Sequence, residues 1–195
     1  MQVFHGSYKK IIEIDLAMCR PNTDFGQGFY VTNIRTQAEF WAKRSGRSRN
    51  TDGIITEFVY YENKGNDCGL EVKKFADYNE EWLDFIVRNR NPETAAPFHR
   101  FDIVEGPVAN DDVAGRIADY LEGEIIKTDF LKELTYHKPT HQICFCSLQS
   151  LQLLVYTGEE QKKKTEIRKL SQRQLAKFIA EEGLSEIEAL KKIGK

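Results

Sequence analysis

The sequence predicts an α+β fold, a mixture of short strands and helices without a regular strand–helix–strand repeat. Alternating apolar residues indicate the strands, apolar residues at helical spacing indicate the helices, and turns rich in glycine or proline separate them. Of the 195 residues, 41% are hydrophobic, which is ample for a packed core. We expect an α+β domain over residues 1–157 and a C-terminal helical appendage over residues 158–195.

Four strands are predicted in the first half of the chain, at residues 2–5, 29–32, 54–61 and 70–75. A loop that contains Pro21 and Asn22 leads to the second strand through the turn Asp24–Gly28. The third and fourth strands are expected to form a hairpin across the turn at residues 63–69.

A helix is predicted between the second and third strands. Thr36 and Glu39 match a capping box, in which the Thr oxygen accepts from the Glu backbone N–H and the Glu side chain reaches back. The helix would run from Gln37 to about Ser45. The polar segment 46–53 would follow it as an exposed loop.

Helices and strands continue in the second half of the domain. Asn79 is expected to cap one helix, and Asp111 to cap another that ends near Glu122 with Gly123 at its C′ position. Further helices are expected from Thr128 and over residues 147–154. Strands are predicted at residues 101–104, 141–146 and 155–157.

The appendage differs in character from the rest of the chain. Capping boxes begin at Ser171 and Ser185, and apolar residues at helical spacing follow each of them, with Gly183 in between. We therefore expect two short amphipathic helices. They would either pack on the main domain or form a small partner-binding, helix-turn-helix-like unit.

The charge of the chain gives no general case for nucleic-acid binding, because the formal net charge is −2. The distribution is uneven: residues 158–195 carry 10 Lys and Arg against 7 Asp and Glu, and residues 1–157 carry 18 against 23. A basic tail on an acidic body could bind an acidic partner, although such tails are usually solvated.

Cysteine usage and hydropathy indicate a cytoplasmic protein. Cys19, Cys68, Cys144 and Cys146 lack the spacing of a metal site, and we expect free thiols. On a strand, Cys144 and Cys146 would share one face. The N-terminus does not read as a signal peptide, and no stretch approaches the roughly 20 apolar residues needed to span a bilayer, so no membrane role is expected.

Two polar rings on glycine-flanked strands are the strongest indication of a ligand site. His5 is followed by Gly6, and Tyr30 follows Gly28 by two positions. If both rings face one cleft, the imidazole could hydrogen-bond a ribose while the phenol ring stacks on a flat base. The alternative interpretation is an ordinary core His and an ordinary core Tyr.

Other nucleotide motifs are absent from the sequence. Gly26 and Gly28 lead into a predicted strand and do not open a helix, which is the wrong context for a dinucleotide fingerprint of the Rossmann type. No Gly-x-x-x-x-Gly-Lys-Ser/Thr run is present. Cysteine proteolysis is also unsupported, because no Cys begins a helix beside an expected His partner.

Several segments together resemble a family of bacterial domains, first catalogued as having unknown function, that is grouped with the ADP-ribosyltransferase-like fold. The resemblance covers roughly residues 1–157 and leaves the appendage unexplained. The number and order of the segments carry it. They are Phe4-His5-Gly6-Ser7, Asp24-Phe25-Gly26-Gln27-Gly28-Phe29-Tyr30-Val31-Thr32, Gln37-Ala38, Trp41-Ala42, Asp102-Ile103-Val104-Glu105-Gly106-Pro107-Val108-Ala109-Asn110-Asp111 and His141-Gln142-Ile143-Cys144-Phe145.

The resemblance implies a split, twisted β core of ADP-ribosyltransferase type that holds the substrate NAD in a bent conformation. In the histidine/tyrosine branch of that superfamily, the first-strand His holds the nicotinamide-side ribose, a role that falls to His5. The backbone of Gly6 would contact the carboxamide, and Tyr30 would stack on the nicotinamide. Ser7 and Gly28 complete the expected cofactor-binding set.

The third motif departs from the pattern, because Gln142 stands where many relatives carry Glu. An amide can orient a ribose hydroxyl but cannot supply negative charge to an oxocarbenium-like C1′ or act as a base. Gln142, with Tyr30, would suffice for transfer to an already good nucleophile. Otherwise another acid enters the cleft, with Asp102, Glu105, Asp111 and Asp112 as candidates, or the protein binds NAD without turnover.

We therefore expect an NAD-dependent mono-ADP-ribosyltransferase that modifies a macromolecule, with a protein or nucleic-acid acceptor. The resemblance places relatives in bacterial conflict and toxin–antitoxin contexts, which implies that the protein could be a toxin or phage-defence effector and that the appendage could bind an antitoxin or another partner. The alternative is a non-catalytic module that binds NAD or another nucleotide, or a partner protein. NAD hydrolysis or phosphate removal from RNA ends ranks lower, because the expected cleft lacks basic residues.

Overall fold

The structure is a computed structural model that describes residues 1–62, 68–91, 98–109, 113, 115, 117, 119, 120, 122–134 and 140–162. The chain forms two compact units, Met1–Lys162 and Lys163–Lys195. The expected appendage helices lie outside the described residues, as do the caps expected at Asp111 and the hairpin turn at 63–67.

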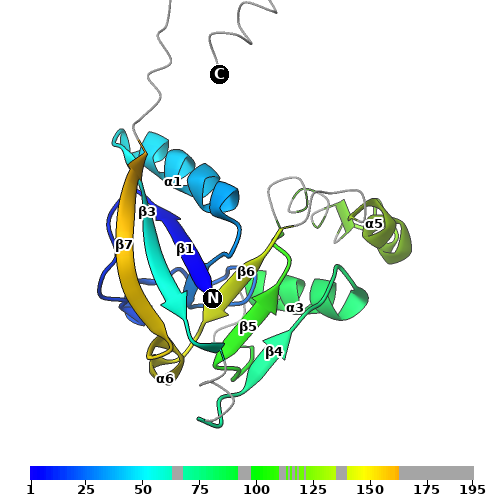
Figure 1. Ribbon diagram of the computed structural model, residues 1–195. Coiled ribbons are helices and arrows are strands. Elements are labelled where there is room, and N and C mark those ends of the chain that lie inside the picture. The colour runs from blue at the N-terminus through cyan, green and yellow to red at the C-terminus, as the bar shows by residue number, and fades with distance from the viewer. Residues whose placement is uncertain are drawn as a thin grey trace, which may run out of the picture. The chain divides into compact units, whose positions relative to one another are not determined.

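Two sheets form the first unit (Figure 1). The first sheet is antiparallel and has the order β1 (Gln2–Ser7), β3 (Gly53–Tyr60), β7 (Leu154–Lys162). The second sheet has the order β2 (Phe29–Val31), β6 (Gln142–Phe145), β5 (Ile103–Gly106), β4 (Val72–Lys74). Its strands pair antiparallel except for β4 and β5, which are parallel. The predicted α+β class is confirmed.

A single β-bridge between Phe4 and Thr32 links the two sheets. The backbone N–H of each residue donates to the carbonyl of the other, at 2.8 Å and 2.9 Å. The strand that carries His5 and the strand that carries Tyr30 therefore meet at this junction.

The main apolar core lies between the facing surfaces of the sheets. Period-two alternation sends every second side chain of each strand inward. The first sheet contributes Val3, Phe58 and Tyr60, and the second contributes Phe29, Val31, Ile103, Ile143 and Phe145. Ile11, Ile14 and Leu16 of the segment after β1, which contains the short helix η1 (Leu16–Met18), pack against this core.

Helix α1 (Arg35–Arg49) covers the outer face of the first sheet, where Ala38 and Ala42 pack on Phe4 and Ile55. Two glycines allow this close approach. A Cβ on Gly6 would lie 2.1 Å from the Ala38 carbonyl oxygen, and a Cβ on Gly53 would lie 2.3 Å from that of Ala42. Gly6 is thus required by helix packing, independently of any ligand.

Helix α3 (Glu80–Arg90) covers the outer face of the second sheet, with Trp82, Phe85 and Ile86 in a core that also holds Phe25 and Val104. The predicted cap is confirmed, because the Asn79 side chain accepts from the backbone N–H of Trp82 at 2.8 Å. Helices α5 (Lys127–Leu134) and α6 (Leu148–Leu151) complete the described elements.

The predicted capping box at Thr36 is wrong. Helix α1 begins two residues earlier than predicted, at Arg35, and its N-cap Ile34 makes no side-chain cap hydrogen bond. The expected loop over residues 46–53 is also partly wrong, because the helix continues to Arg49. Gly46 packs against the backbone of Thr51 to Gly53, and Asn50 ends the helix in the left-handed region at φ 56°.

The predicted hairpin between the third and fourth strands is wrong as well. Both edges of β3 are occupied, by β1 and by β7, so residues 72–74 pair with β5 in the other sheet. The last strand is longer than expected and extends to Lys162, where it pairs with Gly53 at the start of β3. The domain boundary expected after Thr157 therefore falls inside β7.

Candidate functional site

The imidazole ring of His5 contacts two residues of strand β2, Phe29 and Tyr30. Its Nδ1 lies 2.7 Å from the carbonyl oxygen of Tyr30, and because a carbonyl only accepts, Nδ1 carries the proton and donates. The imidazole stacks on Phe29, with ring centroids 4.6 Å apart. Burial lowers the pKa of His5 below its ordinary value of 6.5, against the opposing effect of the bond to Tyr30. His5 is therefore a neutral imidazole at pH 7.

Tyr30 uses its hydroxyl to hold the turn that precedes its strand. The hydroxyl donates to the Gly26 carbonyl at 2.8 Å, accepts from the Phe25 N–H at 2.9 Å and lies 2.7 Å from the Thr23 hydroxyl. Burial is the main cause that raises the pKa of Tyr30 well above 10. The phenol is thus a neutral structural anchor for residues 23–26.

The rings of His5 and Tyr30 lie on opposite sides of β2. His5 stacks on Phe29, which faces the core between the sheets, whereas Tyr30 packs against the core under α3. Neighbouring strand residues point to opposite faces, so the two rings do not face one cleft in this structure. Tyr30 instead lies on the same face of the second sheet as Gln142. Tyr30 pairs with Cys144 of β6, and Gln142 lies two residues before Cys144 on that strand.

Gln142 is part of a buried polar cluster that centres on Asp24, with 7% and 6% of their surfaces exposed. The Gln142 Nε2 donates to Asp24 Oδ2 at 2.7 Å and lies 3.2 Å from the Pro107 carbonyl oxygen. Asp24 Oδ2 also accepts from the Ala109 N–H at 2.8 Å, and Asp24 Oδ1 accepts from Arg90 Nε and Nη2 at 2.9 Å and 2.6 Å. Each carboxylate oxygen therefore has two donors.

The remaining predicted cofactor-binding residues contact the chain itself. A Cβ on Gly28 would lie 2.4 Å from the Cys144 Sγ, so this glycine lets the turn pack on β6. Ser7 ends β1, opposite Ile54 of β3. Together with Gly6 under α1, these positions serve close packing of strands and helix.

The candidate acids are spread over different parts of the fold. Asp102 Oδ2 accepts from the Glu71 N–H at 2.9 Å. Glu105 pairs with His141, at 3.0 Å, and with Lys74, at 2.9 Å, and the bond from His141 is the largest cause that lowers the pKa of Glu105. Asp111 and Asp112 lie outside the described residues.

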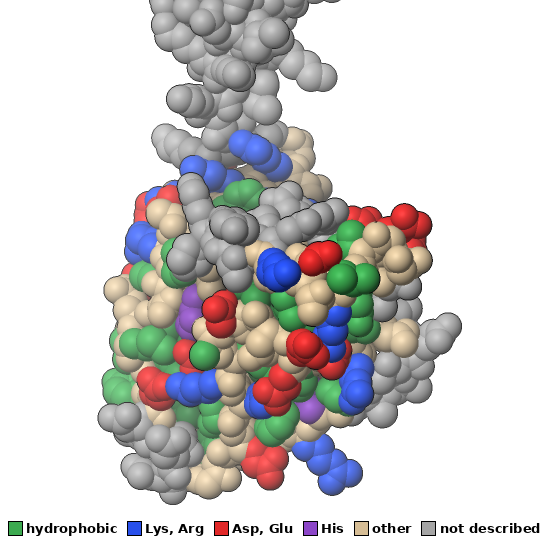
Figure 2. All heavy atoms as spheres, turned by 90° about the vertical axis from the view of Figure 1, so that its right-hand side faces the viewer, with side chains coloured by type: hydrophobic (Ala, Val, Ile, Leu, Met, Phe, Trp, Pro, Cys, Tyr) green, Lys and Arg blue, Asp and Glu red, His purple; other side chains and the backbone are tan. Residues whose placement is uncertain are grey.

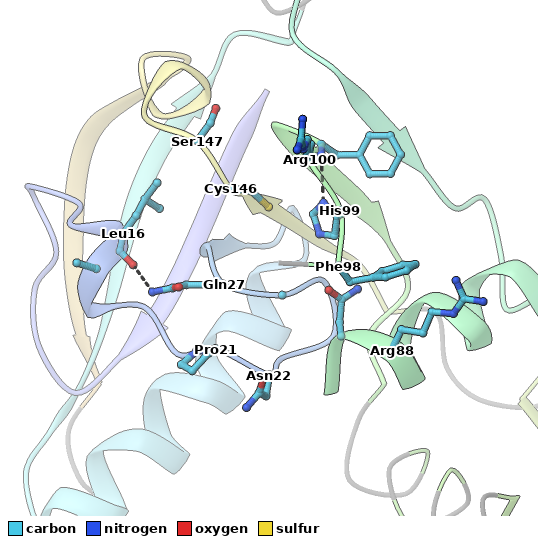
Figure 3. A pocket seen from close by; sticks show the side chains of 14 residues that line it. Leu16, Pro21, Asn22, Gln27, Arg88, Phe98, His99, Arg100, Cys146 and Ser147 are labelled. Atoms are coloured by element: carbon cyan, nitrogen blue, oxygen red, sulfur yellow. Dashed lines mark hydrogen bonds between the residues drawn. The ribbon is translucent and has the colours of Figure 1, made fainter. Parts of the chain in front are cut away.

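A cavity of about 650 Å³ borders the turn at residues 23–26, whose backbone the Tyr30 hydroxyl holds (Figure 3). Residues 16–27 form one wall, the end of α3 and residues 98–101 form the opposite wall, and the residues after β6 close one end. The polar and aromatic lining includes Asn22, Gly26, Gln27, Arg88, Asn89, Phe98, His99, Arg100, Phe101 and Cys146. His5, Tyr30 and Gln142 are not among the lining residues.

His99 stabilises the cavity wall opposite Gln27 through two hydrogen bonds and two ring contacts. Its Nε2 donates to the Phe25 carbonyl at 2.9 Å and its Nδ1 accepts from the Phe101 N–H at 3.2 Å, which fixes a neutral tautomer. Its ring packs between Phe85 and Phe101, with centroids at 4.9 Å and 5.5 Å. Burial lowers the pKa of His99. The imidazole thus ties the Asp24–Gly28 turn to residues 98–101.

The lining suits an anionic ligand with a flat ring. Arg88 and Arg100 bring positive charge, and the Asn22 amide can donate to and accept from hydroxyls. The amide nitrogens of Gln27 and Asn89 donate to backbone carbonyls of the chain, so these two side chains offer their oxygens as acceptors. Phe98, which is 38% exposed, offers a ring at the edge. Within the part of the chain that the structure describes, no carboxylate lines the cavity.

A family model described as "Protein of unknown function (DUF3990)" matches residues 1–156. The chain belongs to this family. The match covers both sheets except the end of β7, and it agrees with the expectation of a family of unknown function; the superfamily and its activity stay predictions. No curated protein and no solved structure matches the chain.

Sequence reasoning missed two residues of this DUF3990 domain. From the sequence, Asp24 was assigned only to a turn. An acidic residue beside the glycines of Asp24–Gly28 is the pattern that could have indicated a buried carboxylate with several hydrogen-bond donors. His99 follows no recognisable pattern, so no signal in a single sequence points to it.

Cysteine and membrane expectations can be compared with the described residues. All four cysteines are free thiols, as predicted, and the Sγ atoms of Cys144 and Cys146 lie 3.4 Å apart. No group of three His, Cys, Asp or Glu side chains in the described ranges could hold a metal ion. None of the described helices has the length and apolar character that a membrane crossing requires.

Proposed function

We propose that this chain binds NAD and transfers its ADP-ribosyl group to a macromolecular acceptor. The observation that carries the proposal is the position of the cavity, whose wall includes Gly26 of the Asp24–Thr32 motif. Tyr30 of the same motif anchors that wall through its bond to the Gly26 carbonyl. The segment that resembles a nicotinamide-binding motif thus borders a cavity of about 650 Å³, within the range of ligand pockets.

The chemistry of the lining supports a dinucleotide. The guanidinium groups of Arg88 and Arg100 match the charge of a diphosphate, and amides match ribose hydroxyls. In the proposed reaction the bond between C1′ and the nicotinamide nitrogen breaks, and nicotinamide leaves with the electron pair. The acceptor then forms a bond to C1′ and gives up its proton. Because none of the described residues that line the cavity is a carboxylate, we assign the reaction to an acceptor that is already a good nucleophile.

A second candidate function is binding without turnover, as a nucleotide-sensing module. It is favoured by the side chains of His5, Tyr30 and Gln142, each of which has a hydrogen-bond partner within the chain. In this version the three residues stabilise the fold around the site and take no part in bond breaking.

Calorimetry with NAD tests both versions on the full chain. We compare wild type with Arg100→Gln, which removes a lining charge, and with Lys132→Gln, which removes a charge on α5 whose side chain is 78% exposed. Loss of one charge-assisted contact should weaken binding about tenfold in Arg100→Gln, with no change in Lys132→Gln. No binding by wild type would overturn both functions.

Transfer is then measured with NAD labelled in its adenylate half and a cell lysate. Label in macromolecules together with free nicotinamide supports the transferase. NAD binding without nicotinamide release contradicts turnover and supports the sensing module.

A further inference from the structure

The exposed face of α1 concentrates positive charge in a chain whose net charge is −2. Its 15 residues contain five Lys and Arg and one acid, Glu39. Arg35 and Glu39, near the start of the helix, are engaged with β3 and β7: Arg35 pairs with Glu57 and Glu160, and Glu39 with Lys162. The positive charge toward solvent therefore comes from the last turns.

The helical geometry places these cations on one face. Ala38, Ala42 and Gly46 are buried against the first sheet. Phe40, Arg44 and Arg47 follow at i, i+4 and i+7 on the opposite side, and Lys43 precedes Arg47 by one turn. These four residues define the α1 basic face, and each is exposed to solvent. Arg47 belongs to this face because the helix continues through residues 46–49, where the sequence predicted a loop.

Aromatic rings accompany the cations on the same helix. Phe40 is 55% exposed and packs edge-on against Trp41, with ring centroids 5.3 Å apart. The guanidinium of Arg44 lies 5.4 Å from the centroid of the Trp41 ring, and that of Arg49 lies 5.1 Å from the Tyr8 ring. An exposed ring beside arginines is the combination that stacks bases and contacts phosphates in single-stranded nucleic-acid binding.

Another face of the molecule lacks this concentration. Figure 2 shows the side that carries α3, β4 and α5, where acidic and basic side chains alternate across the described surface. Mixed charges of this kind are ordinary for a solvated surface. The face shown in Figure 2 therefore has no counterpart of the α1 cations among its described residues.

We propose that the α1 basic face binds single-stranded nucleic acid. Phosphates would contact Lys43, Arg44 and Arg47, and a base would stack on Phe40. As the docking surface of the acceptor, this face rests on the transferase function proposed above. The binding itself needs no NAD, so it can fail or succeed independently of that function.

The test is fluorescence anisotropy with labelled 20-nucleotide single-stranded RNA and DNA, on the full chain and without NAD. We compare wild type with Lys43→Gln/Arg47→Gln and with the matched control Lys74→Gln/Lys132→Gln, whose side chains are exposed on β4 and α5. The α1 variant should bind more weakly. Its plot of log affinity against log salt should be shallower by about 1.4, since each lost phosphate contact of a single strand removes about 0.7. The control should match wild type.

A second variant tests stacking. Phe40→Ala should lose at least about fivefold in affinity, whereas Ile126→Ala, at a residue 64% exposed on the surface before α5, should not. Equal binding by wild type and both α1 variants would overturn the proposal, as would no binding at all. Displacement of the oligonucleotide by polyglutamate at equal charge would also overturn it, in favour of an acidic protein partner. NAD calorimetry on the same variants should be unchanged, which separates this surface from the cavity.

Discussion

The side-chain amide of Gln142 donates to the carboxylate of Asp24 over 2.7 Å, inside a cluster that Arg90 and the Ala109 N–H complete. An amide can do this and a carboxylate cannot, because only the amide has N–H groups. The Gln at this position therefore has a structural reason that concerns Asp24, beyond any effect on a ribose.

Gln142→Glu should destabilise the domain at pH 7. It would place a second carboxylate beside Asp24 in a buried site, where the new group keeps its proton and its pKa rises. Since the folded state would then bind more protons than the unfolded state, the loss of stability should grow as pH rises above about 4.3 and shrink again on acidification. Urea unfolding at pH 5 and pH 8 measures this. A pH-independent loss would contradict the explanation.

Asp24→Ala should lower the free energy of unfolding by about 3 kcal/mol, because it leaves Arg90 and the Gln142 amide without their acceptor. We place the value at the low end of the range for buried pairs, since 27% of the Arg90 side chain is exposed. Asp77→Ala, at an exposed position, serves as the control. Thermal or urea unfolding measures the stability of the two variants. Equal stability would mean that the Asp24 cluster contributes little to the free energy of unfolding.

His5 should make the domain less stable in mild acid. Its folded-state pKa is lowered, so the unfolded state binds the proton more readily, and stability should fall as pH drops through about 6.5. His5→Asn keeps a donor near the Tyr30 carbonyl and removes the titration. The difference in unfolding free energy between pH 7.5 and 5 should therefore be smaller in the variant. His99 contributes in the same direction, so part of the dependence should persist.

Gly6→Ala should disrupt the packing of α1. The added methyl group would lie 2.1 Å from the Ala38 carbonyl oxygen and 2.7 Å from the Ala42 nitrogen, so the helix must shift. Overpacking of this kind costs about 1–3 kcal/mol or more. Gly158→Ala is the matched control, because nothing lies within 4 Å of its Cβ position. A Gly6→Ala variant as stable as the control would show that α1 is not held this closely.

Local patterns predicted most of the strands and the cap of α3, because these depend on neighbouring residues. Asn79 and the apolar spacing of Trp82, Phe85 and Ile86 identify α3 without tertiary information. Strand pairing could not be predicted in the same way. Residues 72–74 pair with β5 because β1 and β7 occupy both edges of β3, and that depends on segments distant in the sequence.

The candidate site was predictable only in part. The turn before the strand of Tyr30 was identified and does border the cavity, but the opposite wall comes from residues 88–89 and 98–101, which contain no motif. The expectation that His5 and Tyr30 face one cleft assumed a common side for their strands. The stacking of His5 on Phe29 shows that the intervening backbone separates them.

The outer edge of strand β7 is where another copy of the protein could pair with the first sheet. It is nine residues long, and no described strand pairs with its outer edge, so its free N–H and C=O groups could add a strand from another molecule. Val155 is 46% exposed, so the first half of the strand is the part more prone to pair with a strand of another molecule. Glu159, Glu160 and Lys162 place charged side chains along the second half, and charged edge strands resist the growth of intermolecular sheets.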